Sequence, residues 1–143
     1  SDAVASLSWS DDGSSLAIGT RNGLVKIWDA HSESVTRIHR DHTARVGITV
    51  WNETCITTGS RDMTIAHQDT RARNVPILRR AEHTQEVCGL KWDRTNTLLA
   101  SGGNDNRLLV WDRSQTRRPL HTFSEHTAAV KALAWSPHSV TSI

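Results

Sequence analysis

Four tryptophans divide this chain into nearly equal lengths. Trp9, Trp51, Trp92 and Trp135 are separated by 42, 41 and 43 residues, and each closes a six-residue stretch: VASLSW, VGITVW, VCGLKW and VKALAW. A fixed period of this size indicates one structural unit used repeatedly, in which each copy buries its apolar face against the next. The repeat therefore restricts the possible folds more than any single segment does.

Two further series keep the same period. The strings IWD (27–29), HQD (67–69) and VWD (110–112) close successive units, and DHTARV (41–46), EHTQEV (82–87) and EHTAAV (125–130) open them. Each unit divides into four runs of about 5 to 6 residues, the usual length of a β-strand, with turn-forming residues between them. A period of about 40 to 45 residues with these openings and closings is typical of the four-stranded blades of WD-repeat propellers.

We therefore predict an all-β fold, a WD-repeat β-propeller with three complete four-stranded blades. The blades are expected at residues 4–40, 46–81 and 87–124, followed by the first strand of a fourth blade at 130–136. No segment has a helical apolar period long enough to compete with this interpretation. Because the chain lacks an initiator Met and begins in a strand-like run, we expect it to be a fragment.

Composition narrows the classes of function. The net charge of +2 comes from 17 basic and 15 acidic residues without a run of like charge, which argues against a nucleic-acid or membrane partner. Cys55 and Cys88 have neither CxxC spacing nor a nearby His pair, so we expect reduced thiols and an intracellular protein. No metal and no cofactor are expected.

The turn in LLASGGNDNRLLVWD, residues 98–112, carries a dense set of special residues. Gly102 and Gly103 allow a tight turn, and Asp105 can accept hydrogen bonds from backbone N–H groups. Asn104 and Asn106 have two interpretations, which the sequence leaves open. They are turn formers that tolerate left-handed backbone angles, or their amides bind an extended peptide on the face that carries the opening loops.

In WD-repeat propellers a hydrogen-bond network links the opening His, the turn Asp, a Ser or Thr hydroxyl and the closing Trp. Placed by position, its members here are Thr20, Asn22 and Trp28 in the first unit; His42, Ser60 and Asp62 in the second; His83, Asp105 and Trp111 in the third. The second unit has Gln68 at the Trp position, and the third has Gly103 where a hydroxyl is expected. Every unit is then incomplete, and we expect water or backbone to fill the vacant positions.

Catalytic and metal sites have simpler explanations. His42, Ser60 and Asp62 are the residue types of an acyl-transfer triad, but the same positions recur in the repeat, so structure explains them and we predict no enzyme activity. The opening histidines, His42, His83 and His126, occur once per unit, where they could not converge on one metal ion.

Charged residues gather in the loops predicted for one face. They are Arg21, Arg45, Arg61, Arg107 and Glu86. Such a set is a solvated rim or a docking surface for a charged linear motif, and the sequence does not decide between the two. A second group near the outermost strand of the second unit is interpreted as charge that protects a sheet edge: Arg71, Arg73, Arg79 and Arg80.

Several longer strings resemble one family: HTARVG, SRDMTI, EVCGLKW, LLASGGNDN, LLVWD and EHTAAVKALAWSPH. They are similar to the fizzy-related branch of the co-activators of the anaphase-promoting complex, and the sister fizzy branch is also similar. The resemblance covers nearly the whole chain. It implies a seven-bladed propeller that acts as a substrate-recognition adaptor, binding KEN-type degrons on its top face so that a ubiquitin ligase can modify cell-cycle proteins.

By this resemblance, Asn104 and Asn106 bind the degron, and Arg45, Arg61 and Glu86 are secondary candidates on the same face. The implied partners are subunits of the anaphase-promoting complex, degron-bearing cell-cycle substrates and inhibitors with pseudo-degrons, in the nucleus and cytoplasm. The D-box site and ligase-docking tails of the family are not expected in this chain. The alternative is a WD-repeat interaction scaffold without degron recognition.

Overall fold

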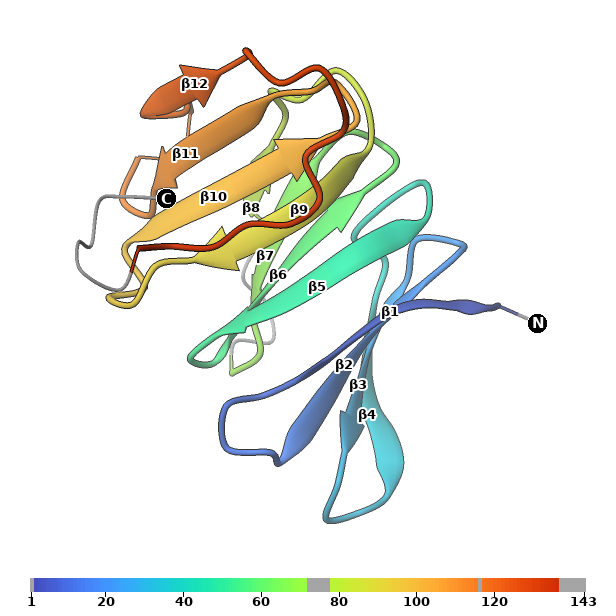
Figure 1. The fold of residues 1–143 in the computed structure, drawn as a ribbon. Helices are drawn as coiled ribbons and strands as arrows, with labels where there is room; N and C mark the ends of the chain where they lie inside the picture. Colours follow the sequence, from blue (N-terminus) through green and yellow to red (C-terminus); the bar gives the residue numbers. More distant parts are fainter. Residues whose placement is uncertain (1, 72–77, 116, 137–143) are drawn as a thin grey trace.

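The computed structural model describes residues 2–71, 78–115 and 117–136, and it contains three antiparallel four-stranded sheets (Figure 1). The first sheet consists of β1 (Val4–Trp9), β2 (Ser15–Thr20), β3 (Val25–Asp29) and β4 (Ser34–His39). The second consists of β5 (Val46–Asn52), β6 (Cys55–Ser60), β7 (Ile65–Asp69) and β8 (Leu78–Arg80). The third consists of β9 (Val87–Trp92), β10 (Leu98–Gly103), β11 (Leu108–Asp112) and β12 (His121–Phe123).

Within each sheet the strands pair in chain order, as blades of a propeller do. The described part of the chain contains no helix, and therefore none that could cross a membrane. The all-β prediction with three four-stranded blades is thus confirmed. Each unit matches its repeat because short strands joined by tight turns pair with their nearest neighbours in sequence.

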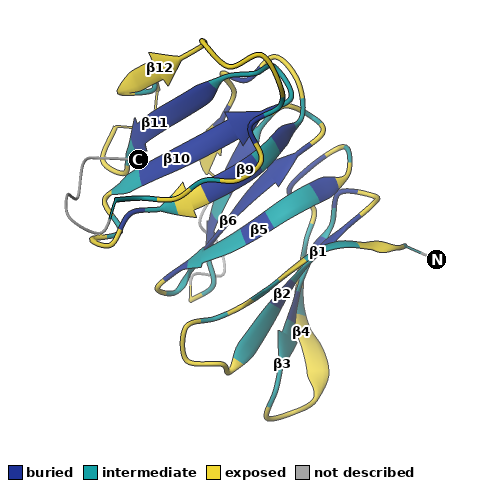
Figure 2. Cartoon of the chain, viewed as in Figure 1, coloured by how far each residue is buried: buried dark blue, intermediate teal, exposed yellow. Residues whose placement is uncertain are grey.

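The sheets pack face to face, with β1 against β5 and β5 against β9. Apolar side chains fill both interfaces: Ala17, Val25, Ile27, Val46 and Ile56 between the first and second sheets, and Ile65, Val87, Leu90, Leu99, Leu109 and Trp111 between the second and third. Figure 2 shows buried residues along β6, β10 and β11, whereas β4 and β12 are largely exposed. The core therefore lies between the repeats rather than within one.

The tryptophans that set the period connect neighbouring units. The indole N–H of Trp51 donates to the Ser8 carbonyl at 2.8 Å, and that of Trp135 donates to the Lys91 carbonyl at 3.0 Å. Trp92 also reaches the preceding unit, but it donates to a side chain, the Thr57 hydroxyl at 3.3 Å. A Trp at this position is favoured because its ring packs on apolar neighbours while its N–H reaches the preceding unit.

The fourth unit differs from the prediction. Residues 130–136 run beside β9 (Figure 1), but the described part forms no strand there. The Val130 N–H donates to the Gly103 carbonyl at 3.0 Å, and the Val130 carbonyl occupies the space that a Cβ on Gly102 would need. The segment thus lies where the next innermost strand is expected, but a strand also requires a ladder, and among the described residues no strand of a fourth unit pairs with it.

Arg80 corrects the interpretation of the arginines near the second sheet's outer strand. Instead of protecting an edge, its side chain is buried, with 3% of the residue exposed. Its guanidinium lies 5.0 Å from the centre of the Trp111 ring and donates to His67 Nε2 at 3.0 Å and to the Gln115 carbonyl at 2.8 Å. Burial lowers the pKa of Arg80 to about 10, although the negative charge of Asp112 acts in the opposite direction and raises it. Arg80 therefore joins the second and third sheets.

Arg71 and Arg79 do not share this role. Arg71 pairs with Asp69 at 3.4 Å, and Arg79 donates to the Asp41 carbonyl. Arg73 lies outside the described residues.

We expect Leu99→Ala to lower the free energy of unfolding by about 2–5 kcal/mol, because Leu99 is fully buried between two sheets and truncation leaves a cavity. Leu120→Ala is the matched control, since Leu120 is 52% exposed and should change stability by about 0.5 kcal/mol or less. Urea denaturation measures both. Equal losses in the two variants would mean that the sheets do not share this core.

His67 should make stability depend on pH. Burial, together with the charges of Arg80 and Arg113, lowers the pKa of His67 to about 3. An unfolded His titrates near pH 6.5, so below that pH the unfolded chain binds the extra proton, and stability present above pH 6.5 is lost as the pH falls. Between pH 7.5 and 5.5, proton uptake by the unfolded His67 lowers the free energy of unfolding by about 1.4 kcal/mol. We expect His67→Gln to abolish this part of the pH dependence. Denaturation of both proteins at each pH tests this, and parallel losses would contradict it.

Candidate functional site

The third sheet contains a complete polar network at the end where the opening loops lie. His83 Nδ1 is 3.0 Å from Asp105 Oδ2, and His83 Nε2 is 2.8 Å from the Ser101 hydroxyl, which accepts the Trp111 indole N–H at 2.9 Å. His83 therefore donates from Nδ1 to the carboxylate and accepts at Nε2. Burial lowers the pKa of His83 despite the opposing charge of Asp105, so the imidazole stays neutral.

This arrangement corrects the prediction that the third unit lacks a hydroxyl. The hydroxyl comes from Ser101, two residues before Gly103, and both positions lie on the same side of β10. A Cβ on Gly103 would lie 2.6 Å from Asp105 Oδ1 and 2.7 Å from His83 Nδ1. Glycine is thus required at 103 because the His–Asp pair occupies the space that a side chain would take.

The second sheet has a related network with the same shift of two residues. His42 contacts Asp62 at 3.0 Å and the Thr58 hydroxyl at 2.8 Å. Ser60, expected as the hydroxyl partner of His42, instead donates to the Ala44 carbonyl at 3.1 Å. Gln68 is buried at the Trp position, and its Oε1 has no partner among the described residues, so the filling of this position by water stays a prediction.

The first sheet does not bring its three predicted members together. The Thr20 hydroxyl accepts the Leu24 N–H at 3.1 Å, and the backbone N–H of Asn22 donates to Asp2 at 3.0 Å. Trp28 packs edge-on against Trp9, with ring centres 6.1 Å apart. These residues stabilise their own turn and sheet.

His42, Ser60 and Asp62 do not form an acyl-transfer triad. Ser60 is bonded to backbone and His42 to Thr58, so the residue types of a triad are present without its arrangement. Within residues 2–71, 78–115 and 117–136, His, Cys, Asp and Glu form no group that could hold a metal ion.

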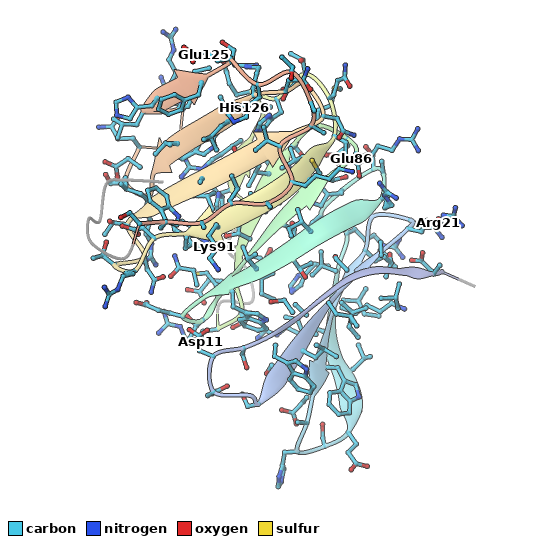
Figure 3. The ribbon with its side chains drawn as sticks, in the orientation of Figure 1. Asp11, Arg21, Glu86, Lys91, Glu125 and His126 are labelled. Atoms are coloured by element: carbon cyan, nitrogen blue, oxygen red, sulfur yellow. The ribbon has the colours of Figure 1, made fainter. Side chains whose placement is uncertain are left out.

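A cavity of about 260 Å³ opens at the same end of the sheets as the His networks. We call it the Asn104 cavity, and its walls are Ala5, Arg45, Gly47, Glu86, Cys88, Asn104 and Lys131. Figure 3 shows Glu86 and Arg21 at this end of the strands, and Lys91 and Asp11 at the opposite end. Polar groups of both charge signs thus surround an opening large enough for side chains of a peptide.

Four of the wall residues hold the same position in the repeat. Ala5, Gly47, Cys88 and Lys131 are each the second residue of an innermost stretch, directly after Val. In all three sheets the register between the first two strands shifts at this point, leaving the second residue without a partner. Such a β-bulge redirects a side chain, here towards the cavity. Sequence reasoning missed these residues, although aligning the repeats would have revealed their common position.

The polar wall is held in place by one contact between the second and third units and by two contacts within the third. Arg45 Nη2 donates to Glu86 Oε2 at 2.6 Å; the Arg45 side chain is 49% exposed and that of Glu86 only 10%. The Asn104 N–H donates to the Glu86 carbonyl at 2.9 Å, and its Oδ1 lies 3.7 Å from the Cys88 sulfur. Burial and the nearby charge of Glu86 raise the pKa of the Cys88 thiol, which keeps it protonated.

Two of the five residues predicted to bind the degron are not in the cavity wall. Asn106 has a φ of 64°, so it adopts the left-handed backbone expected of a turn former, and its N–H donates to the Gly103 carbonyl at 3.2 Å. Arg61 is exposed, and its backbone N–H donates to the Arg45 carbonyl at 2.9 Å. The structure therefore groups Asn104 with Arg45 and Glu86, and places Asn106 and Arg61 beside that group.

Comparison with known proteins gives consistent matches. The family model "WD domain, G-beta repeat" matches residues 74–112 and 117–141, and "Anaphase-promoting complex subunit 4 WD40 domain" matches residues 1–57. One chain of the solved "Crystal Structure of Mitotic Checkpoint Complex" superposes with a TM-score of 0.90 at 44% identity, covering 97% of this chain and 42% of that one.

Three curated relatives cover almost the whole chain. WD repeat-containing protein srw1 of Schizosaccharomyces pombe is 50% identical over 137 residues, and Protein FIZZY-RELATED 2 of Arabidopsis thaliana is 49% identical over 137. Anaphase-promoting complex subunit cdc20 of Dictyostelium discoideum is 45% identical over 139. The matches cover 95–96% of this chain, which spans only 24–28% of the length of these relatives.

We expect Ser101→Ala to destabilise the fold by about 1–3 kcal/mol, because it leaves the Trp111 N–H and His83 Nε2 buried without a partner. Ser114→Ala is the control, since Ser114 is exposed and bonds only within its own turn. Thermal unfolding followed by circular dichroism measures both. A Ser101→Ala protein as stable as the control would show that the network adds nothing to stability.

Proposed function

We propose that this chain is part of a WD-repeat protein of the fizzy-related and Cdc20 type, and that it acts in a substrate-recognition adaptor of the anaphase-promoting complex. Relatives are named as a subunit or as a cofactor of that complex. The proposed role is to hold short KEN-type degrons so that cell-cycle proteins are ubiquitinated. It requires binding and no catalysis by this chain.

The Asn104 cavity is the observation that carries this proposal. A Lys–Glu–Asn sequence presents a cation, an anion and an amide. The cavity offers the Glu86 carboxylate for the cation, Arg45 and Lys131 for the anion, and the Asn104 side chain for the amide. Amide–amide pairing uses both a donor and an acceptor on each side, so it selects Asn more sharply than charge alone does. Asn106 and Arg61, beside the cavity, are the secondary contacts.

The proposed partners are of two kinds. Degron-bearing cell-cycle substrates, and inhibitors that carry pseudo-degrons, bind the Asn104 cavity. Subunits of the anaphase-promoting complex are the partners that the adaptor role requires. The structural similarity to a chain in a mitotic checkpoint complex supports the inhibitors. Action in the nucleus and cytoplasm is part of this proposal.

Fluorescence anisotropy with a labelled KEN peptide and a scrambled control tests degron binding. We expect Asn104→Ala to weaken binding of the KEN peptide about tenfold, equivalent to about 1.4 kcal/mol, because the amide contact is lost. Asn106→Gly is the companion variant, since glycine retains the left-handed turn while removing the side chain. It should weaken binding less than Asn104→Ala does.

The alternative role, a scaffold without degron recognition, predicts a different result. The KEN and scrambled peptides would bind equally weakly, and neither Asn variant would change the affinity. That outcome would assign Asn104 to the turn alone and leave the surface of the sheets as the binding element.

A further inference from the structure

A second cavity, of about 180 Å³, lies at the opposite end of the second and third sheets. We call it the Asn52 cavity, and its walls are Asn52, Cys55, His67, Leu78, Arg80, Trp92 and Arg113. We propose that it binds a short acidic peptide segment through one large apolar side chain, such as Trp. This site is separate from the Asn104 cavity and does not depend on degron binding.

Asn52 is the first observation that points to a ligand. It ends β5, only 1% of the residue is exposed, and its Oδ1 has no hydrogen-bond partner in the described part of the chain. A buried acceptor without a donor costs about 1–3 kcal/mol, so a ligand N–H placed there regains that free energy. Asn52, which lines the cavity, thus supplies an acceptor that no donor in the described part of the chain satisfies.

The charge of the wall selects the partner. Among the described residues that line the cavity, Arg80 and Arg113 carry charge, His67 is neutral, and none is a carboxylate. Arg80 is already bonded to His67 and to two carbonyls. Arg113 is exposed, and within the described part of the chain its guanidinium donates a long bond, 3.3 Å, to the Asn96 carbonyl, so it is available to a carboxylate at the rim.

Much of the remaining wall is apolar. Trp92 and Leu78 line the cavity, together with Cys55. Burial raises the pKa of Cys55, with the charge of Asp69 acting in the same direction, so it behaves as a small neutral group. A ligand Trp combines an apolar ring with one N–H, which matches apolar walls and one free acceptor.

The two cavities lie at opposite ends of the strands, so two peptides could bind together. Glu86, in the Asn104 cavity, lies at one end of β9, whereas Trp92 is the last residue of the same strand. Figure 3 shows the separation, with Glu86 at one end of the strands and Lys91, next to Trp92, at the other.

The two cysteines provide a built-in test, because Cys55 lines one cavity and Cys88 the other. The probe is acetyl-Glu-Glu-Trp-Glu-Glu-amide, added to the full-length protein during alkylation by iodoacetamide and read out by mass spectrometry. With peptide at about ten times its Kd, we expect alkylation of Cys55 to slow about tenfold and that of Cys88 to stay unchanged. Replacing Trp by Ala, or each Glu by Lys, should abolish the protection.

Arg113→Ala should weaken the acidic peptide about fivefold, with Arg118→Ala as the matched control, since Arg118 is exposed and outside the cavity. Fluorescence anisotropy of the labelled peptide measures both affinities directly. The test therefore also works if Cys55 reacts slowly with iodoacetamide in the folded protein. Absence of binding, equal protection of both cysteines, equal binding of the Ala peptide or an unchanged affinity of Arg113→Ala would each overturn the proposal. A KEN peptide that fails to bind has no bearing on it, because that test reports on Asn104.

Discussion

The structure depends on the burial of one sheet face against the next. A single four-stranded sheet of this length cannot cover its own apolar side chains, and the two interfaces supply the cover: Val46 and Ile56 on one side, Leu99 and Trp111 on the other. The indoles at the ends of the innermost strands reinforce this, since Trp51 donates across the boundary between units. The period of about 42 residues in the sequence therefore has a direct cause, because each unit needs the same inward face and the same link.

Burial of apolar faces leaves polar turn groups to be satisfied locally. In the third sheet, His83 and Asp105 fill the space beside Gly103, and Ser101 ties the pair to Trp111. Because a satisfied network in a low-dielectric interior is rigid, the turn that begins at Asn104 is held on a fixed base. The site thus depends on the fold twice, once through this turn and once through the β-bulges that redirect side chains into the cavity.

Sequence reasoning predicted the strands, their grouping into sheets and the face that carries Asn104, because these follow from periodicity and turn chemistry. It misplaced the network hydroxyl, since residues two apart on a strand share a side and only coordinates show which of Ser101 and Gly103 reaches His83. It assigned Arg80 to an edge because charge is usually exposed, whereas packing on Trp111 buries it. Cys88 was missed because a bulge changes the facing of one residue without altering the apolar pattern.

The two ends of the sheets differ in chemistry because their connections differ. At one end, turns from β6 to β7 and from β10 to β11 carry Asp62 and Asp105, which must be paired with His42 and His83, so polar residues gather there. At the other end, the innermost strands close with Trp92 and its equivalents, and the gap between sheets is bridged by Arg80. Polar pairing favours selection of a motif by charge and amide contacts, whereas aromatic walls with a cationic rim favour an anchored apolar side chain. The same repeat therefore provides two kinds of surface. They lie at opposite ends of the strands, so a ligand at one does not cover the other.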